Sequence, residues 1–446
     1  MGTCQWWRCL LKSKGENRMM KINAIVKELK KYEKITDYAI EEVITKSFEQ
    51  FYDLQKLETA RETFTDEIDV RIYCAFEEDA KKYLGSASFI VSHKLSKKEL
   101  DILIEDAIYQ ASFVKNEYYE IPSGTKKLSF KQKPEAKPAF DLLQDIANIF
   151  FNEKTDECMF NALECFYYEK ETRLVNSKGV DYKKTTHKFE VEAIPSFKKK
   201  NEGRSSASEL YRMFEYDVFD EDKIKEDAKN AILAVLNRSK AERFSTRMNI
   251  NVILKDKEIL EMMDELIYSY HYAVVYRHAN VKEIGQYIQE NPINPLNIAY
   301  IPASKGDFFD TDGVLLKEAV IVREGKVENY FGNNRYAYYL SKEPTGNMET
   351  IKLKPGKKAY EKMKKEPYIE ITDLSGLQVE LYEDYIGGEV RCANYFDGEK
   401  TYPITAFSFS GSLQECINSL ELSKEHTKIA HYQGPKYVLL KNMTIL

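Results

Sequence analysis

The chain has 446 residues, of which 43% are hydrophobic and 13% aromatic, and this composition excludes an intrinsically disordered protein and predicts two or more folded domains. The 66 lysines and arginines against 72 aspartates and glutamates give a formal net charge of −6 at pH 7, which argues against nucleic acid as a partner. No apolar stretch approaches the roughly 18 residues that a membrane-spanning helix needs, so no membrane segment is predicted.

The seven cysteines are odd in number, scattered, and never arranged as Cys-x-x-Cys. This distribution argues against a disulfide framework or a zinc ribbon and favours a reducing compartment, so we expect a cytoplasmic protein. Residues 1–20 lack the apolar region and cleavage site of a signal peptide and look unlike the rest of the chain. We expect a non-native or disordered leader there.

Residues 21–240 predict a sheet covered by helices. After a helix near the start of this half, β-branched and aromatic segments predict strands at residues 38–51, 67–76 and 85–92. Ser96 and Glu99 have the spacing of a capping box, which predicts the start of a helix.

The stretch 123–138 combines proline, glycine and lysine and predicts an exposed loop, and a helix over 139–151 follows it. Two strands are expected on either side of a turn at 176–179, because apolar and charged residues alternate after the turn. A long helix capped by Asp220 or Asp222 ends this half of the chain.

Beyond residue 240 the pattern changes to short strands separated by glycine turns. The segment 319–331 predicts a hairpin over Glu324 and Gly325. The sequence therefore predicts an α+β protein with an N-terminal sheet-plus-helix domain at 21–240 and a predominantly β C-terminal domain at 241–446.

The residues give no catalytic constellation. None of the six histidines stands in a His-Glu-x-x-His arrangement, and no Gly-x-Ser-x-Gly elbow or phosphate-binding loop is present. His271 and His278 could share a helix face, and His426 and His431 are five residues apart, but neither pair has an acidic or cysteine ligand at a convincing spacing. We therefore predict no catalytic residue, no metal ligand and no cofactor.

Four segments, at residues 174–180, 309–320, 344–347 and 387–420, resemble in their order and motifs the TldD/PmbA family. LVNSKGV at 174–180 resembles its Asn-Ser-x-Gly turn, and FDTDGVLLKEAV from residue 309, followed by PTGN at 344–347, resembles its Asp-x-x-Gly, hairpin and Thr-Gly-Asn pattern. The segment 387–420 resembles the late region with an Asp-Gly turn, a strand and a short helix. The resemblance spans about residues 21 to 446 and implies the fold of that family.

The TldD branch of this family carries a His-Glu-x-x-x-His helix and a further cysteine ligand near the C-terminus. Here Asp264 and Glu265 stand about where His-Glu would, no histidine follows at the required spacing, and residues 426–438 contain no Gly-Cys-Gly-Lys segment. The sequence is therefore similar to the PmbA (TldE) type, which lacks the zinc motif.

The resemblance implies a non-catalytic subunit that assembles with a TldD-like zinc metallopeptidase to process unfolded peptides. Thr345, Gly346 and Asn347 are its candidate assembly or peptide-docking turn. One alternative is a stand-alone peptide-binding homodimer of the same fold. Another is a divergent metallopeptidase that uses Asp264 and Glu265 with His271 and His278, or the pair His426 and His431; a DNA-related role has no support from the charge.

Overall fold

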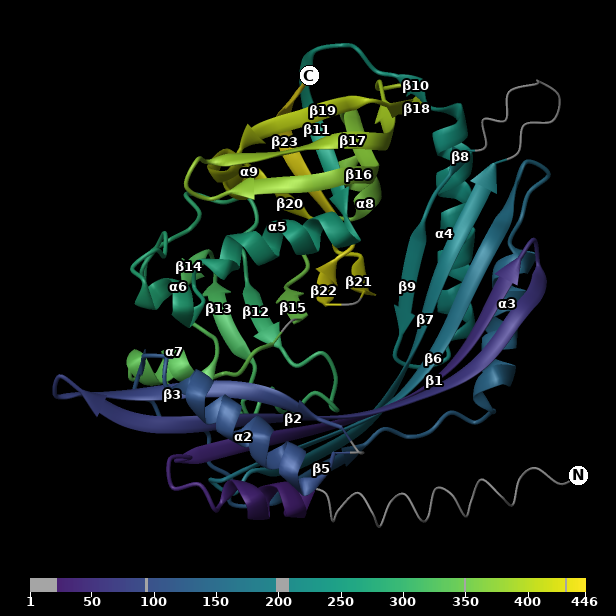
Figure 1. Ribbon diagram of the computed structural model, residues 1–446. Helices are drawn as coiled ribbons and strands as arrows, with labels where there is room; N and C mark the ends of the chain where they lie inside the picture. Colours follow the sequence, from purple (N-terminus) through teal and green to yellow (C-terminus); the bar gives the residue numbers. More distant parts are fainter. Residues whose placement is uncertain (1–21, 93–94, 198–207, 349, 430) are drawn as a thin grey trace, which may run out of the picture.

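The computed structural model of this protein describes residues 22–92, 95–197, 208–348, 350–429 and 431–446 (Figure 1). The leader predicted at residues 1–20 lies outside the described residues. Within the described ranges, no helix combines the length and the apolar character that crossing a membrane requires.

A nine-stranded sheet dominates the first half of the chain, in the order β4-β3-β2-β1-β6-β7-β5, with β8 and β9 also paired to β7. The three strands predicted before residue 93 are confirmed as β1, β2 and β3, and all three are longer than predicted. The strands of this sheet are β1 (Asp37–Asp53), β2 (Lys56–Glu78), β3 (Lys81–Val91), β4 (Asn116–Glu117), β5 (Lys127–Lys131), β6 (Cys158–Asn176), β7 (Asp181–Phe197), β8 (Ser208–Glu209) and β9 (Arg212–Tyr216).

The predicted turn joins β6 to β7. The Asn176 Oδ1 accepts the backbone N–H groups of Lys178 at 2.9 Å and Val180 at 3.0 Å. Gly179 has a φ of +89°, in the left-handed region that glycine adopts without steric cost. The side chain of Asn176 and the glycine together fix the turn that brings β7 back along β6.

Besides the helical residues 22–29, three further helices accompany the sheet: α2 (Lys97–Ala111), α3 (Ala139–Asn152) and α4 (Glu221–Lys240). The predicted capping box is confirmed, since Ser96 Oγ accepts the Glu99 N–H at 3.3 Å and Glu99 Oε2 accepts the Ser96 N–H at 2.7 Å. Of the two candidate caps of α4, Asp220 is the one that accepts the Lys223 N–H, at 3.1 Å.

Helices α3 and α4 cover one face of β1, β6 and β7 and leave the opposite face open. Buried residues of both helices, such as Leu143 and Val235, belong to one core with Cys165 and Val191 of the strands. Successive side chains of a strand alternate between the two faces, so the neighbours of these core residues point to the open side. In the view of Figure 1, α3 and α4 lie behind the strands.

The stretch 123–138, predicted as an exposed loop, contains the strand β5. Residues 127–131 pair in parallel with residues 181–185 of β7. Parallel pairing with a distant strand is a tertiary contact, and the lysine-rich local sequence carries no signal of it. The loop prediction is therefore wrong for these five residues, although most of their side chains are exposed.

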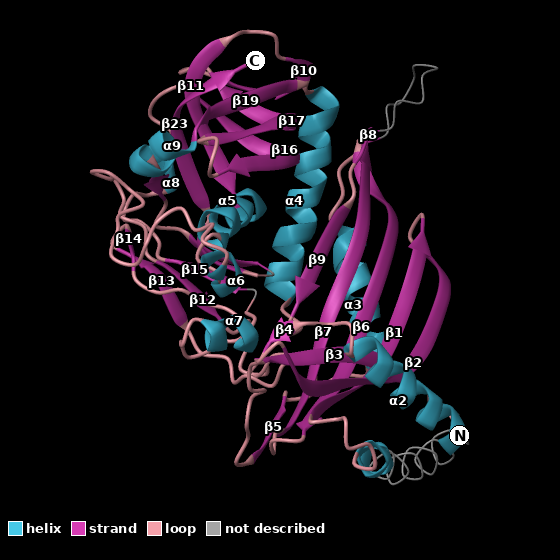
Figure 2. Ribbon diagram, turned by 60° about the vertical axis from the view of Figure 1, so that its left-hand side comes forward, coloured by secondary structure: helices cyan, strands magenta, loops and turns pink. Residues whose placement is uncertain are grey.

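The second half of the chain contains an eight-stranded and a six-stranded sheet (Figure 2). The larger sheet comprises β10 (Glu242–Arg243), β11 (Met248–Lys255), β16 (Tyr368–Glu380), β17 (Tyr385–Phe396), β18 (Thr401–Thr405), β19 (Phe407–Ser412), β20 (Glu421–Leu422) and β23 (Tyr437–Ile445). The smaller sheet comprises β12 (Ile298–Ile301), β13 (Ala319–Arg323), β14 (Lys326–Val327), β15 (Thr350–Leu353), β21 (His426–Ile429) and β22 (Tyr432–Pro435).

Short helices complete this half: α5 (Asp256–Tyr268), α6 (Tyr272–Tyr276), α7 (Asn334–Tyr339), α8 (Tyr360–Met363) and α9 (Leu413–Ser419). The predicted hairpin is confirmed, because Val322 pairs with Val327 and Arg323 with Lys326 across Glu324 and Gly325. One large core joins both sheets and α5.

The α+β class predicted from the sequence is confirmed. The predicted boundary between residues 240 and 241 falls between α4 and β10 and stays a prediction. The two halves of the chain touch through ion pairs, including Arg71 with Asp312 and Lys184 with Asp307, each at 3.0 Å. A small apolar cluster also joins them, in which Phe309 packs among Leu174, Val180 and Tyr182: these last three residues come from the first half.

Candidate functional site

Asp264 and Glu265, which the sequence resemblance predicts at the position of the zinc motif, lie on the exposed face of α5. The helix follows β11 and buries its apolar side, which includes Met262, Met263 and Leu266, in the large core. Asp264 and Glu265 therefore point away from the core, and both are exposed. The pair stands on a rigid element, as a catalytic pair would.

The Asp264 carboxylate already accepts a hydrogen bond from another side chain of the protein. The hydroxyl of the buried residue Tyr300 donates a hydrogen bond to Asp264 Oδ1 at 2.5 Å. Burial of Tyr300 and the adjacent carboxylate raise the pKa of the tyrosine. Burial and the carboxylates of Asp264 and Glu380 raise the pKa of Glu265. The group is thus a pair of acids with a tyrosine, without an imidazole.

Position 269, where a second histidine would stand, is occupied by Ser269, which is buried. The nearest histidine in the chain, His271, caps α6: its Nδ1 accepts the Ala273 N–H at 3.1 Å. Burial lowers the pKa of His271, so the ring is neutral at pH 7 and its proton resides on Nε2. In that state neither ring nitrogen offers a lone pair to a metal.

The other histidines that the sequence analysis considered as metal ligands do not complete a set of ligands for a metal ion. His278 is exposed just beyond α6, and His426 and His431 lie at opposite ends of the hairpin formed by β21 and β22. Nowhere in the described ranges do three histidine, cysteine, aspartate or glutamate side chains form a group that could hold a metal ion. The structure therefore does not bring together the residues of the divergent metallopeptidase alternative.

The turn of Thr345, Gly346 and Asn347 is tied to the Asp-x-x-Gly turn. The Asn347 N–H donates to Asp310 Oδ2 at 2.9 Å, while Asp310 Oδ1 accepts two further backbone N–H groups. Thr345 Oγ1 accepts the Gly332 N–H at 2.9 Å. Burial, followed by the carboxylate of Asp312, raises the pKa of Asp310 to about 6. These contacts hold three loops together.

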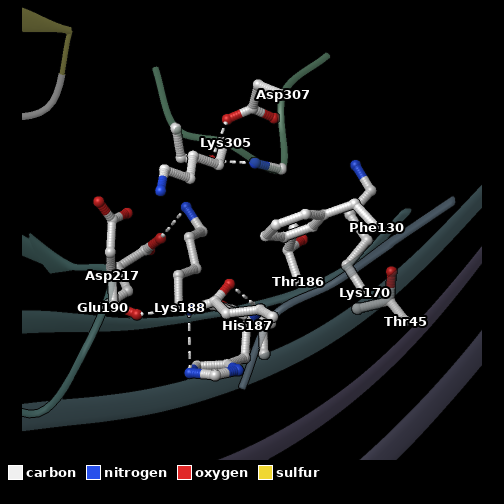
Figure 3. Close-up of a pocket in the computed structure, with 14 residues that line it drawn as sticks. Thr45, Phe130, Lys170, Thr186, His187, Lys188, Glu190, Asp217, Lys305 and Asp307 are labelled. Atoms are coloured by element: carbon white, nitrogen blue, oxygen red, sulfur yellow. Dashed lines mark hydrogen bonds and ion pairs between the residues drawn. The ribbon is translucent and has the colours of Figure 1, made fainter. Parts of the chain in front are cut away.

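A second feature is a cavity of about 580 Å³ between the open face of the large sheet and the 304–307 loop (Figure 3). Its floor comes from β1, β6 and β7, where Thr45, Lys170 and Thr186 lie opposite one another on three adjacent strands. Its other lining residues are Phe130, Gln132, Tyr168, His187, Lys188, Glu190, Asp217, Ser304, Lys305, Gly306 and Asp307.

Gln132 completes the edge of the sheet beneath this cavity. Strands β5 and β9 both pair with β7, and they leave residues 186–188 of β7 between them. Gln132 fills the gap: its Oε1 accepts the His187 N–H at 3.0 Å, and its Nε2 donates to the Asp217 carbonyl at 2.8 Å. The amide side chain thus replaces one residue of a strand and makes the floor rigid.

The 304–307 loop is clamped in place above the floor. Ser304 Oγ donates to Asp307 at 2.9 Å and accepts the Gly306 N–H at 3.1 Å. A Cβ on Gly306 would come within 2.9 Å of both Phe130 and Thr186, so only glycine allows the loop to approach the sheet this closely.

The acids of the cavity all take part in ion pairs. Asp307 pairs with Lys184 at 3.0 Å, Asp217 with Lys428 at 3.1 Å, and Glu190 with Lys188 at 3.2 Å. Burial lowers the pKa of Lys188, but hydrogen bonds to Glu215 and Glu190 outweigh it and raise that pKa. Burial and the carboxylates of Glu190 and Glu49 raise the pKa of Tyr168 to about 12, so the phenol stays protonated.

Sequence reasoning missed this cavity. Gln132 lies in a stretch predicted as a loop, and Lys170, His187 and Lys305 come from segments far apart in the chain. Their proximity depends on strand register and on the position of the 304–307 loop, and no local pattern contains that information.

Residues 248–446 match the family model described as the PmbA/TldA metallopeptidase C-terminal domain. Over nearly its whole length the chain is similar to the crystal structure of TldE from Thermococcus kodakarensis, with a TM-score of 0.74, 14% identity, and coverage of 95% of this chain and 99% of that chain. No curated protein matches the chain significantly.

Two further solved structures, both described as candidate modulators of DNA gyrase, are similar. The Bacteroides thetaiotaomicron protein has a TM-score of 0.73 at 14% identity, with 96% of this chain and 98% of that chain covered. The Thermotoga maritima protein has a TM-score of 0.69 at 14% identity, with 92% and 96% covered. Residues 248–446 thus correspond to the C-terminal domain of the PmbA/TldA metallopeptidase family, and the chain has the fold of the TldE structure over nearly its whole length.

Proposed function

We propose that this chain is a TldE-like, non-catalytic subunit that assembles with a TldD-like zinc metallopeptidase to process unfolded peptides. The observation that carries the proposal is the state of α5. Where the family's zinc helix would present imidazoles, the chain presents Asp264, bonded to Tyr300, and Glu265. A glutamate without a zinc-bound water has nothing to activate.

The contacts of His271 support this proposal. A zinc peptidase site needs three protein ligands and an open position for water. His271 is the imidazole nearest to the acids in sequence, and its Nδ1 is committed to capping α6. Recruiting His271 as a ligand would cost that cap and would require the helix to rearrange.

The open face of the large sheet supports the role with peptides. A subunit that acts on unfolded chains of varied sequence must recognise mainly backbone and extended shape. The open face and the cavity under the 304–307 loop, which is lined by both polar and apolar side chains, offer a surface of this kind. In this proposal the backbone of the Thr345–Asn347 turn has a structural role, because the Asn347 N–H donates a hydrogen bond to Asp310. The exposed side chain of Asn347 remains available for assembly with a partner.

The cysteines favour a cytoplasmic location. The five cysteines of the described residues are all free and buried, which suits a reducing compartment in which no disulfide is needed.

The test is reconstitution with the TldD-like protein of the same genome. Light scattering of the purified mixture should show a heterodimer, and peptidase activity on an unfolded substrate should exceed that of the TldD-like protein alone. If the mixture shows neither a heterodimer nor a gain in activity, the proposal fails and the stand-alone homodimer replaces it.

A further inference from the structure

We infer that the cavity between the open sheet face and the 304–307 loop binds a carboxylate of an extended peptide through Lys170 and Lys305. The inference rests on the proposed function and deepens it, because it names the chemical group by which a peptide would be held.

The first argument is the charge that remains after the internal ion pairs are formed. Three lysines and three acids line the cavity, but the acids are all paired, two of them with Lys184 and Lys428 from outside the lining. Lys170 and Lys305 take part in no ion pair with another described residue. The cavity therefore presents two ammonium groups, those of Lys170 and Lys305, that form no ion pair with a carboxylate of the described residues.

The second argument is the fixed position of these two lysines. Lys170 lies on β6 between Thr45 of β1 and Thr186 of β7, two short side chains that leave room around its stem. Lys305 stands between Ser304 and Gly306 on the clamped loop, and Figure 3 shows its side chain among the residues lining the cavity. Attraction between opposite charges is stronger in a partly enclosed site than in open water.

The third argument is the chemistry of the remaining lining. Lys170, Lys305 and the threonine hydroxyls can all donate hydrogen bonds, and the Gln132 amide is already engaged by the backbone. Phe130 adds an apolar wall. A cluster of donors around an apolar wall suits a carboxylate attached to a carbon chain, as at the C-terminus of a peptide or on an acidic side chain.

The test uses the isolated full-length chain and three fluorescent, unstructured peptides that share one sequence apart from a single substitution in the third. The first has a free C-terminus, the second is amidated, and the third is amidated and carries an internal glutamate. We expect the free acid to bind at least about tenfold more tightly than the amide, a difference that weakens as ionic strength rises.

The variant that tests the site is Lys170→Gln with Lys305→Gln, which should remove the preference for the free acid. A matched control removes the same charge elsewhere, at the exposed residues Lys357 and Lys400, and should keep the preference. The variant Lys170→Arg with Lys305→Arg should also keep it, which separates loss of charge from loss of folding.

Each outcome decides the inference. When the free acid binds more tightly than the amide, tight binding of the third peptide shows that the site also accepts acidic side chains, whereas weak binding of the third peptide restricts the site to the C-terminal carboxylate. Equal binding of the acid and the amide overturns the inference, and so does an equal loss in the control variant. The peptide-binding assay contains no TldD-like partner, so its result is independent of the reconstitution test. If an active heterodimer forms but the isolated chain binds the acid and the amide equally, this inference alone is contradicted.

Discussion

At the scale of single residues, two turns with the same construction meet where the halves of the chain join. Asn176 and Asp310 each use one oxygen to accept the N–H groups two and four residues later, and each turn has a glycine at the third position after it. Gly313 lies against the side chains of Leu174 and Val180. The motifs by which the sequence resembles its family therefore build the junction of the two halves.

Asp310 should make stability depend on pH. Its pKa in the folded protein is about 6, above the ordinary aspartate value of 3.8, so the folded state binds the proton more tightly than the unfolded state does. Its contribution to stability is therefore full below about pH 3.8 and is lost as the pH rises through about 6.

Chemical unfolding of the wild type and of Asp310→Asn between pH 4 and pH 7 measures this contribution, with the pH values chosen to bracket the pKa of about 6. We expect the free energy of unfolding of the wild type, relative to the variant, to fall as the pH rises. A difference that grows with pH would show that the backbone hydrogen bonds outweigh burial.

Glu265 should be dispensable for catalysis. The side chain is exposed and has no zinc-bound water to activate, so Glu265→Gln should leave the activity of the reconstituted pair within about twofold. The matched control is the same substitution at the glutamate of the partner's zinc motif, which should abolish activity. A loss of two orders of magnitude with Glu265→Gln would make this chain a contributor to the chemistry.

At the scale of elements, the sequence predicted correctly those helix ends and turns that depend on contacts between residues close together in the chain. The capping box of α2, the cap of α4 and the hairpin at Glu324 and Gly325 all involve residues a few positions apart, and all are confirmed. The strand β5 and the Gln132 bridge depend on contacts with β7 about 50 residues away in sequence. For that reason the class and the order of elements could be predicted, while the cavity could not.

The cap of α4 gives a test at this scale. Asp220 accepts the Lys223 N–H, so Asp220→Ala should lower the free energy of unfolding by about 1 kcal/mol. Asp222 lies in the first turn of the same helix without capping it, and Asp222→Ala should cost less. Thermal or urea unfolding of the two variants compares them, and equal losses would mean that only the favourable charge at the helix start matters.

At the scale of the whole molecule, the chain has the fold of the TldE structure over nearly its whole length, and the helix that the sequence resemblance predicts at the position of the TldD zinc helix carries two exposed acids. The fold matches TldE over 95% of this chain at 14% identity, so the architecture has been maintained through extensive sequence change. The resemblance in the sequence predicted this fold correctly, while the placement of Asp264 and Glu265 at the position of the zinc motif stays a prediction. It could not predict the bond from Tyr300 to Asp264 or the role of His271, because these depend on how α5 packs against β12 and α6.

The central claim is that this chain has no catalytic metal of its own. The most direct measurement is the zinc content of the isolated chain after equilibration with zinc and removal of the excess, together with its peptidase activity. The account predicts far less than one zinc per chain and no useful cleavage, since the described residues offer no ligand set. One tightly bound zinc per chain, whose removal by a chelator abolishes peptidase activity, would contradict it.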